Sequence, residues 1–157
     1  MNQGILQELQ DECAGYLASQ PYFSAQPIIP IVAEREREIE SAIQVALTKI
    51  GVGVVLFMPQ AERVSENIFP PYFEEIRVTA RVYENVLINR SSPSGTLQPV
   101  TKVAEALAFY LHHFRPQNMH ECLVLQSIRH APEESFALAY DVELSMQAGI
   151  SSEPQRT

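Results

Sequence analysis

The chain has 157 residues and a formal net charge of -8, from 19 acidic and 11 basic residues. A length of this order favours one domain with one hydrophobic core, and 46% hydrophobic residues exclude wholesale disorder. The acidic balance disfavours nucleic-acid binding, which depends on clustered Lys and Arg. We expect a single domain over residues 1–150 and a polar, disordered tail over residues 151–157.

The cysteines and the apolar segments bear on the cellular compartment. Cys13 and Cys122 are too few for a disulfide framework and fit small core side chains in a reducing compartment. No basic segment followed by an apolar run opens the chain, so we expect no signal peptide. No apolar stretch approaches the roughly 20 residues that cross a bilayer. These features predict a protein that stays in the cytoplasm.

The first third of the chain predicts a helix, a short strand and a second helix. Apolar residues from Ile5 to Leu17 repeat with helical spacing. Residues 28–33 form a strand candidate at a sheet edge or a bulge, because Pro30 cannot donate to a strand ladder. Apolar residues within 39–50 predict a second helix, which Gly51 is well placed to cap.

A run of alternating charges at residues 34–38 opens this second helix. A solvated first turn explains the run, because carboxylates are stabilised near the positive end of a helix. An acidic patch that binds a partner is the alternative.

The middle of the chain predicts two strands around a long loop. Residues 52–58 are almost continuously apolar, as in a strand covered on both faces. Residues 59–72 carry Pro59, Pro70 and Pro71 and predict a long loop, which in a small domain is more often functional than not.

Residues 73–90 predict a long strand or a strand pair. One face of it is apolar, with Ile76, Val82 and Val86 among its members, and Glu84 interrupts that face. We favour a bulge at Tyr83–Glu84 that turns this carboxylate outward; the alternative is a row that is only partly buried.

The last part of the chain predicts one helix and two strands. A Ser/Gly-rich loop at residues 91–95 precedes a helix from Val100 to Phe114. Strands at residues 122–130 and 136–146 follow, joined by a hairpin turn at residues 131–134. The order α-β-α-β-β-α-β-β predicts an α+β fold, in which about three helices pack on a mixed, largely antiparallel sheet.

The sequence predicts no catalytic, cofactor or metal site. Phosphate-binding loops, the dinucleotide fingerprint, the nucleophile elbow and the zinc-protease helix are absent. His112 and His113 are adjacent on a helix and point about 100° apart, and residues 120–122 alternate between strand faces, so neither set suits a metal ion. Acidic pairs such as Glu8 and Glu12 fit solvated surfaces. We therefore expect no enzymatic activity, no cofactor and no metal.

Two stretches of the sequence resemble the tail terminator, or tail completion, proteins of tailed bacteriophages and prophages. One is residues 82–90 (VYENVLINR) with the loop and helix that follow; the other is the helix ending in Gly51 with the strand at residues 54–59. As an order of elements, the similarity spans most of residues 28–146. It implies a small α+β subunit without catalytic residues. Such subunits form a ring, usually a hexamer, that caps the finished tail tube and meets the head connector.

On this resemblance we expect a minor tail protein, assembled in the bacterial host cytoplasm and located in the virion tail or neck. Its expected partners are copies of itself, the tail tube protein and the head-tail connector protein, with no membrane. Loops at residues 59–72 and 90–99 are the expected contacts with the tube and the next subunit. The candidate contact residues are Arg63, Glu66, Phe69, Glu84, Asn85, Asn89 and Arg90.

Two alternatives remain open. One is another head-tail connector or neck protein, which differs in the partner that it binds. The other is a small ligand-binding or enzymatic α+β domain whose site is assembled from distant residues. Oligomeric state and a polar, pre-formed pocket distinguish this second alternative from the ring proteins.

Overall fold

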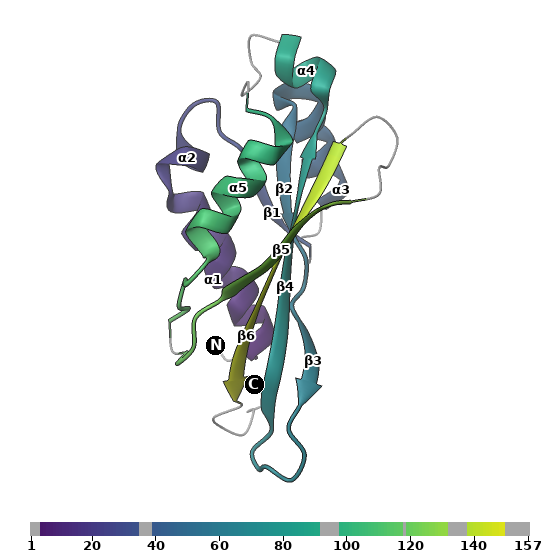
Figure 1. Cartoon of the computed structure of the whole chain (residues 1–157). Helices are drawn as coiled ribbons and strands as arrows, with labels where there is room; N and C mark the ends of the chain where they lie inside the picture. The colour runs from purple at the N-terminus through teal and green to yellow at the C-terminus, as the bar shows by residue number, and fades with distance from the viewer. Residues whose placement is uncertain (1–3, 35–38, 92–97, 118, 132–137, 150–157) are drawn as a thin grey trace.

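The computed structural model describes residues 4–34, 39–91, 98–117, 119–131 and 138–149 (Figure 1). Within this part of the chain, six strands form one mixed, largely antiparallel sheet with helices packed on it, which confirms the predicted α+β fold. Five strands follow the order β1-β2-β4-β6-β5, and β3 pairs with β4. Only β1 and β2 pair in parallel among these described strands.

Three predicted helices correspond to α1, to α3 with its π-helical continuation η1, and to α5. The short helices α2 and α4 were not predicted. In chain order the elements are α1 (Ile5–Ser19), α2 (Pro21–Ser24), β1 (Ile31–Ala33), α3 (Ile39–Val45), η1 (Ala46–Ile50), β2 (Val52–Leu56), β3 (Gln60–Val64), β4 (Tyr72–Glu84), α4 (Val86–Ser91), α5 (Val100–Leu111), β5 (Val124–His130) and β6 (Leu138–Gly149).

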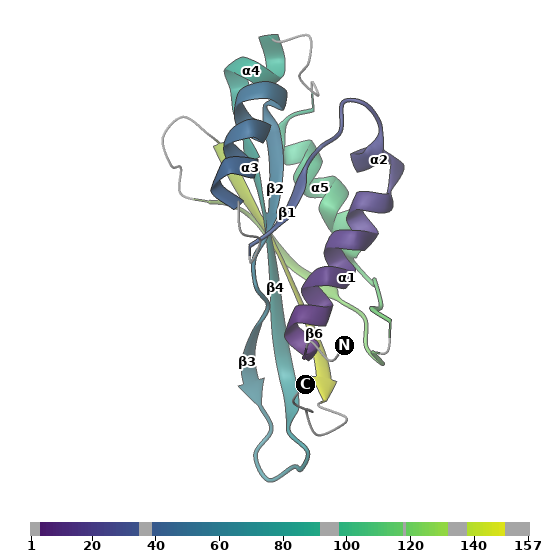
Figure 2. The ribbon, with the colours of Figure 1, turned by 180° about the vertical axis from the view of Figure 1, so that it is seen from behind.

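The hydrophobic core lies between the sheet and a layer made of α1, α2 and α5, while α3 lies on the opposite side (Figures 1 and 2). The even-numbered residues of β4 from Ile76 to Val82 are at most 1% exposed and face the helix layer. In α1, the helical spacing of Leu9, Cys13 and Leu17 brings all three side chains to full burial. Apolar periodicity therefore predicted these two faces correctly.

Strand β2 is buried at all five positions, as its continuous apolar sequence predicts. The helix layer covers one face, and η1 covers the other. A Cβ added to Gly53 would lie 3.0 Å from the Ala46 Cβ, so η1 approaches this strand closely. Strand β1 lies at the sheet edge, as Pro30 predicts, and the Pro30 carbonyl accepts a hydrogen bond from the Val54 N–H (2.9 Å).

The prediction of a long loop at residues 59–72 was wrong. Residues 60–64 form β3, which pairs antiparallel with β4 and leaves only a turn at residues 65–71. All five residues of β3 are exposed, so the strand lacks the apolar alternation by which sequence patterns reveal strands. Main-chain pairing with β4 places these residues in the sheet instead.

The prediction of a strand through residue 90 was wrong beyond Glu84. The Asn85 N–H donates to the Gly51 carbonyl (2.8 Å), and the Asn85 Oδ1 accepts from the Ile88 N–H (3.4 Å), which begins α4. The predicted bulge at residues 83–84 is also absent, because both residues pair in regular register with β2 and β6. The register shift in β4 lies between Phe73 and Ile76 instead.

Some predicted features lie outside the described residues. They are the charge run at 35–38, most of the loop at 91–95, the turn at 132–134 and the tail at 151–157. Of the charge run, Glu34 is described, and its Oε1 accepts a hydrogen bond from the Met58 N–H (2.9 Å). None of the helices in the described ranges is long and apolar enough to cross a membrane.

The two cysteines provide a test of this core. Burial, with a smaller contribution from Glu12, raises the pKa of the Cys13 thiol to about 12, and its side chain is fully buried, whereas Cys122 is partly exposed. A thiol with a raised pKa stays protonated in neutral solution, so we expect a thiol reagent near pH 8 to modify Cys122 and spare Cys13. Mass spectrometry of the modified protein measures this. Equal rates at both thiols would contradict the placement of α1, and unfolding in guanidinium, where both should react, is the control.

Candidate functional site

The candidate contact residues fall into two groups at opposite ends of β4. Arg63, Glu66 and Phe69 belong to the hairpin of β3 and β4. Arg63 pairs with Glu75, nine residues from Glu84 along β4, so at roughly 3.3 Å per residue the two groups lie about 30 Å or more apart. The structure therefore does not bring them into one site. The second group consists of Glu84, Asn85, Asn89 and Arg90.

The first group lies on a projecting hairpin. We call residues 60–77 the arm and residues 64–71 its tip, which extends past the paired strands at the end opposite α4 (Figure 1). Phe69 is 94% exposed, Ile68 54% and Val64 51%. Apolar side chains gathered on a projecting turn favour contact with another molecule, because leaving them in water costs free energy. Arg63 and Glu66 are exposed beside them.

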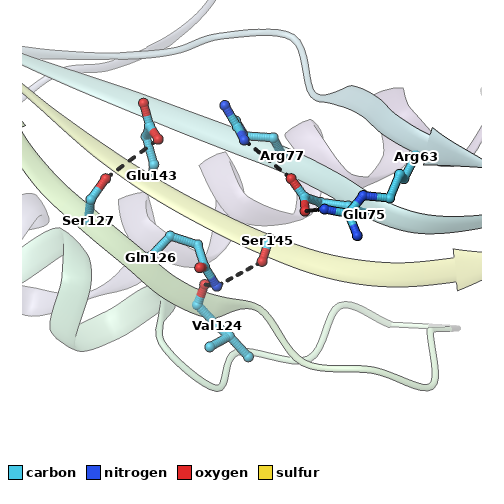
Figure 3. Close-up of polar contacts among 8 residues, drawn as sticks. All are labelled: Arg63, Glu75, Arg77, Val124, Gln126, Ser127, Glu143 and Ser145. Atoms are coloured by element: carbon cyan, nitrogen blue, oxygen red, sulfur yellow. Dashed lines mark hydrogen bonds and ion pairs between the residues drawn. The ribbon is translucent and has the colours of Figure 1, made fainter.

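Charged side chains cross the arm. Arg63 and Arg77 both reach Glu75, with N–O distances of 3.8 and 3.2 Å (Figure 3). On the turn, the Ser65 Oγ donates to Glu74 (2.8 Å). Exposed ion pairs contribute roughly 0.2–1 kcal/mol each, so the backbone ladder, and not these pairs, holds the arm.

The second group forms a buried junction, and the prediction of an outward Glu84 was wrong. Glu84 and Asn89 are both 0% exposed. The Glu84 carboxylate accepts hydrogen bonds from the Val100 N–H (3.0 Å) and the Asn89 Nδ2 (2.8 Å), and Asn89 also donates to the Gln98 carbonyl (2.7 Å). Side chains without accessible surface cannot contact a neighbouring subunit, so the contact prediction fails for these two residues.

The remaining members of the second group lie around this junction. Asn85 lies between β4 and α4, is partly buried, and ties this connection to the end of η1 because its N–H donates to the Gly51 carbonyl. Gly51 has φ 95, and a Cβ there would lie 2.5 Å from the Asn89 nitrogen, so only glycine fits. Arg90 lies in α4, and its side chain is outside the described part of the chain. The junction thus joins η1, β4, α4 and α5, which is a structural task.

The sheet face turned away from α1 and α5, which we call the outer face, is polar along β3, β4, β6 and β5. Arg81 donates two hydrogen bonds to Asp141 (2.7 and 3.0 Å), which raise the pKa of Arg81, and its guanidinium lies 5.1 Å from the Phe57 ring centre. Nearby, Ser127 bonds to Glu143 and Gln126 bonds to Ser145 (Figure 3). An antiparallel sheet with one polar face commonly meets solvent or a partner there.

A surface pocket of about 450 Å³ lies on the other side of the molecule, against α1. The rings of Tyr16 and Phe114 stack there with centroids 4.2 Å apart. Sequence reasoning treated Glu8 and Glu12 only as solvated charges and missed the pocket, because nothing in the local pattern joins Phe114 to α1. The lining residues are Glu8, Asp11, Glu12, Gly15, Tyr16 and Phe114.

Within the described residues, no three His, Cys, Asp or Glu side chains gather to hold a metal ion. The expectation that His112 and His113 point apart was wrong, because their rings stack with centroids 3.9 Å apart. Helix α5 ends at Leu111, and His113 has φ 67, which takes it off the helical path. The His112 Nδ1 accepts a hydrogen bond from the Leu125 N–H (3.0 Å), so this nitrogen is committed to β5.

No protein-family model matches this chain, and no curated protein is significantly similar to it. A functional assignment therefore depends on the geometry above and on the resemblance stated for residues 28–146. Of the residues that carry this resemblance, 82–90 form the end of β4, the buried junction and most of α4.

The buried junction predicts a stability defect. Replacing Glu84 with Ala leaves the Val100 N–H and the Asn89 amide without their acceptor, so we expect the free energy of unfolding to fall by about 2–4 kcal/mol. Glu84→Gln keeps one carbonyl acceptor and should cost less. Urea unfolding measures both.

Glu74→Ala is the matched control, because Glu74 is exposed on the same strand and, among the contacts described, bonds only to the partly exposed Ser65. We expect this substitution to change stability by less than about 0.5 kcal/mol. A Glu84→Ala variant as stable as the control would contradict the structural role of the junction.

Proposed function

We propose that the chain is a structural subunit of a phage or prophage tail that assembles with its copies, as a hexamer on the resemblance, into a ring. The ring terminates the tail tube and joins it to the head. The observation that carries the proposal is the arm, whose exposed apolar tip projects from the sheet at the end opposite α4 (Figures 1 and 2). The resemblance in residues 28–146 supplies the class of assembly.

The arm suits a binding task because a rigid body holds it. Strand β4 is one continuous strand from the buried junction at Glu84 to the arm at Tyr72, with a register shift between Phe73 and Ile76. Both of its long edges are paired, with β2 and β3 on one side and β6 on the other. A segment carried on such a scaffold keeps its direction, so little ordering free energy is lost when it binds.

The proposal assigns no enzymatic role. Strongly shifted pKa values often mark active sites, but the shifts found among the described residues have structural causes. Burial raises the pKa of Cys13 and, with the nearby Tyr110 and Glu105, that of Tyr22, while hydrogen bonds to Asp141 raise that of Arg81. These causes support a packing role for the first two groups and an ion-pair role for the third.

The arm tip provides the test of this function. We propose to replace Ile68 and Phe69 with Ser in the parent phage, where the virion location of the protein can be checked directly. Both side chains are exposed, so we expect the protein to fold as before and its melting temperature to stay within a few degrees. We expect infectious particles to fall by about a hundredfold or more, because a few apolar anchors carry most of an interface's free energy. Electron microscopy should show tubes of unregulated length or tails without heads.

Leu87→Ser is the matched control, since Leu87 is 77% exposed and lies in α4, at the other end of the molecule. Normal particle numbers from the arm-tip variant would show that the tip has no part in assembly. Normal particles from a full gene deletion would refute the tail function itself. Heads that bind the protein while tail tubes do not would favour the neck-protein alternative.

A further inference from the structure

A second exposed apolar surface lies on the helix layer. Phe109, in α5, is 78% exposed, which exceeds the exposure of every other large apolar side chain described outside the arm tip. It follows the fully buried Leu107 by two residues, so it lies about 200° around the helix from Leu107 and points away from the sheet. An apolar side chain of this size left in water costs free energy, which contact with another molecule would recover.

Phe109 is part of a row of aromatic rings that runs from α5 to α2. The ring centres of Phe109 and Tyr110 are 5.3 Å apart. Tyr110 lies 6.0 Å from Phe23, and Phe23 lies 5.0 Å from Tyr22. Phe23 is buried and holds the row against the core, whereas Tyr22 and Tyr110 are partly exposed. We call Tyr22, Phe109 and Tyr110 the aromatic patch. Such rings offer a large contact area with little conformational entropy to lose on binding.

The charge of the arm bears on which surface its tip can meet. The arm carries four acidic and two basic residues, a net charge of -2, and Glu66 is the one charged residue of the tip. Three carboxylates line the α1 pocket, and residues 1–34 contain no Lys or Arg. Residues 98–117, which include α5, instead carry Lys102 and Arg115 against Glu105, a net charge of +1 with neutral histidines. Like charges therefore disfavour the α1 pocket as the receptor of the tip and favour the aromatic patch.

We propose that the arm tip of one copy docks on the aromatic patch of the next copy, with Phe69 packed against Phe109. The tip projects apolar side chains that its own chain leaves exposed, and the patch presents rings that are exposed in the same way. Aromatic pairs in offset or edge-to-face contact add to the gain from apolar burial. The inference rests on the proposed ring and names the surface that the arm tip meets.

The positions of the two surfaces explain why this contact can make a ring. The tip projects beyond the helix layer in both views, while α5 and α2 lie nearer the end of the molecule that carries α4 (Figures 1 and 2). Each copy thus has one tip and one patch at separate places, and it can give its tip to one neighbour while its patch receives the tip of another. Such a heterologous contact closes into a ring when the rotation between copies allows.

Cysteine cross-linking tests the contact directly. Cys122 is partly exposed and is replaced with Ser in every sample, while the buried Cys13 stays. A Phe69→Cys variant and a Phe109→Cys variant are mixed under a mild oxidant and run on a denaturing gel without reductant. We expect a cross-linked dimer in the mixture and little in either variant alone, because a disulfide forms only when the two Cβ atoms come within about 4.5 Å. The bridge traps the contact even though each variant has lost one ring.

A chain that carries both cysteines extends the test to the ring. Each copy can then bridge to two neighbours, so we expect a ladder of species that ends at the size of the ring and collapses to the monomer with reductant. The control pairs Phe69→Cys with Leu87→Cys, since Leu87 is 77% exposed but lies in α4 and outside the aromatic patch. Bridging as strong in this control as in the Phe69 and Phe109 pair would contradict the docking.

Substitutions measure what the contact contributes to assembly. We expect Phe109→Ser to weaken assembly by about tenfold or more in sedimentation, because central aromatic anchors carry much of an interface's free energy. Leu87→Ser should assemble as the unaltered protein does, and circular dichroism checks that both variants are folded.

Reversing the charge of the tip tests the choice of receptor. Glu66→Lys brings a positive charge toward the α5 segment, so we expect assembly at low salt to weaken by about two- to fivefold. Stronger assembly of this variant would show that the tip meets an acidic surface, such as the α1 pocket, and would overturn the docking.

The outcomes separate the inference from the proposed function. If the unaltered protein forms rings while Phe69 and Phe109 give no bridge and Phe109→Ser assembles normally, the docking is wrong and the ring stands. If Phe109→Ser forms rings but no longer binds tail tubes, the patch serves the tube and the docking is wrong. If the ladder stops at a dimer that exchanges two tips, the docking stands and the ring is wrong. If the unaltered protein stays monomeric both alone and with tail tubes, both are wrong.

Discussion

The arrangement of this fold depends on one buried carboxylate. Glu84 ends the central strand β4, and its two oxygens accept hydrogen bonds from the first N–H of α5 and from the side chain of Asn89 in α4. Helix α5 begins after Pro99, which provides no side-chain cap, so the acceptor for its first N–H comes from the strand. A carboxylate at this position also complements the positive end of the helix. The start of α5 is therefore tied to the end of β4.

The junction limits where the helices can lie, and this in turn leaves the outer face open. With α5 tied to the end of β4, its apolar face packs on β4 and β6 beside α1, and the three helices α1, α2 and α5 share one side. Gly51 brings α4 against η1 and holds η1 over β2. The described helices then provide no cover for β3, β5 and β6 on the outer side. The polar side chains at these positions agree with that exposure.

The spacing of apolar residues in the sequence predicted those helices and strands whose own residues are buried on one face or two. The helical spacing of α1 and α5, the continuous apolar run of β2 and the alternation in β6 each depend on burial of one face or two, and all were found. Strand β3 was missed because none of its residues is buried. Helix α4 was missed because Val86 and Ile88 continue the alternation of β4, while the turn that ends the strand depends on a bond from Asn85 to Gly51, far away in the sequence.

The candidate contact residues also fall into those whose surroundings depend on distant contacts and those whose surroundings are local. A carboxylate in an apolar row was expected to need solvent or a second subunit, but Glu84 meets its donors within the chain, and the sequence does not show that α5 begins beside it. Arg63, Glu66 and Phe69 were chosen because they lie in an irregular segment, and their exposure does not depend on distant contacts. The pocket on α1 was missed because Phe114 reaches Tyr16 only through the packing of the helix layer.

The residues that carry the sequence resemblance have a structural task in the folded chain. Residues 82–90 carry much of this resemblance, and in the folded chain they build the junction that positions α4 and α5. The contacts described for Glu84, Asn85 and Asn89 connect strands and helices within the chain. On the proposed function, specificity for partners belongs to the arm tip, which the architecture presents but does not dictate. A chain with the same junction and different surface residues would keep this fold and bind other neighbours, so the partner of this protein has to be sought through its surfaces.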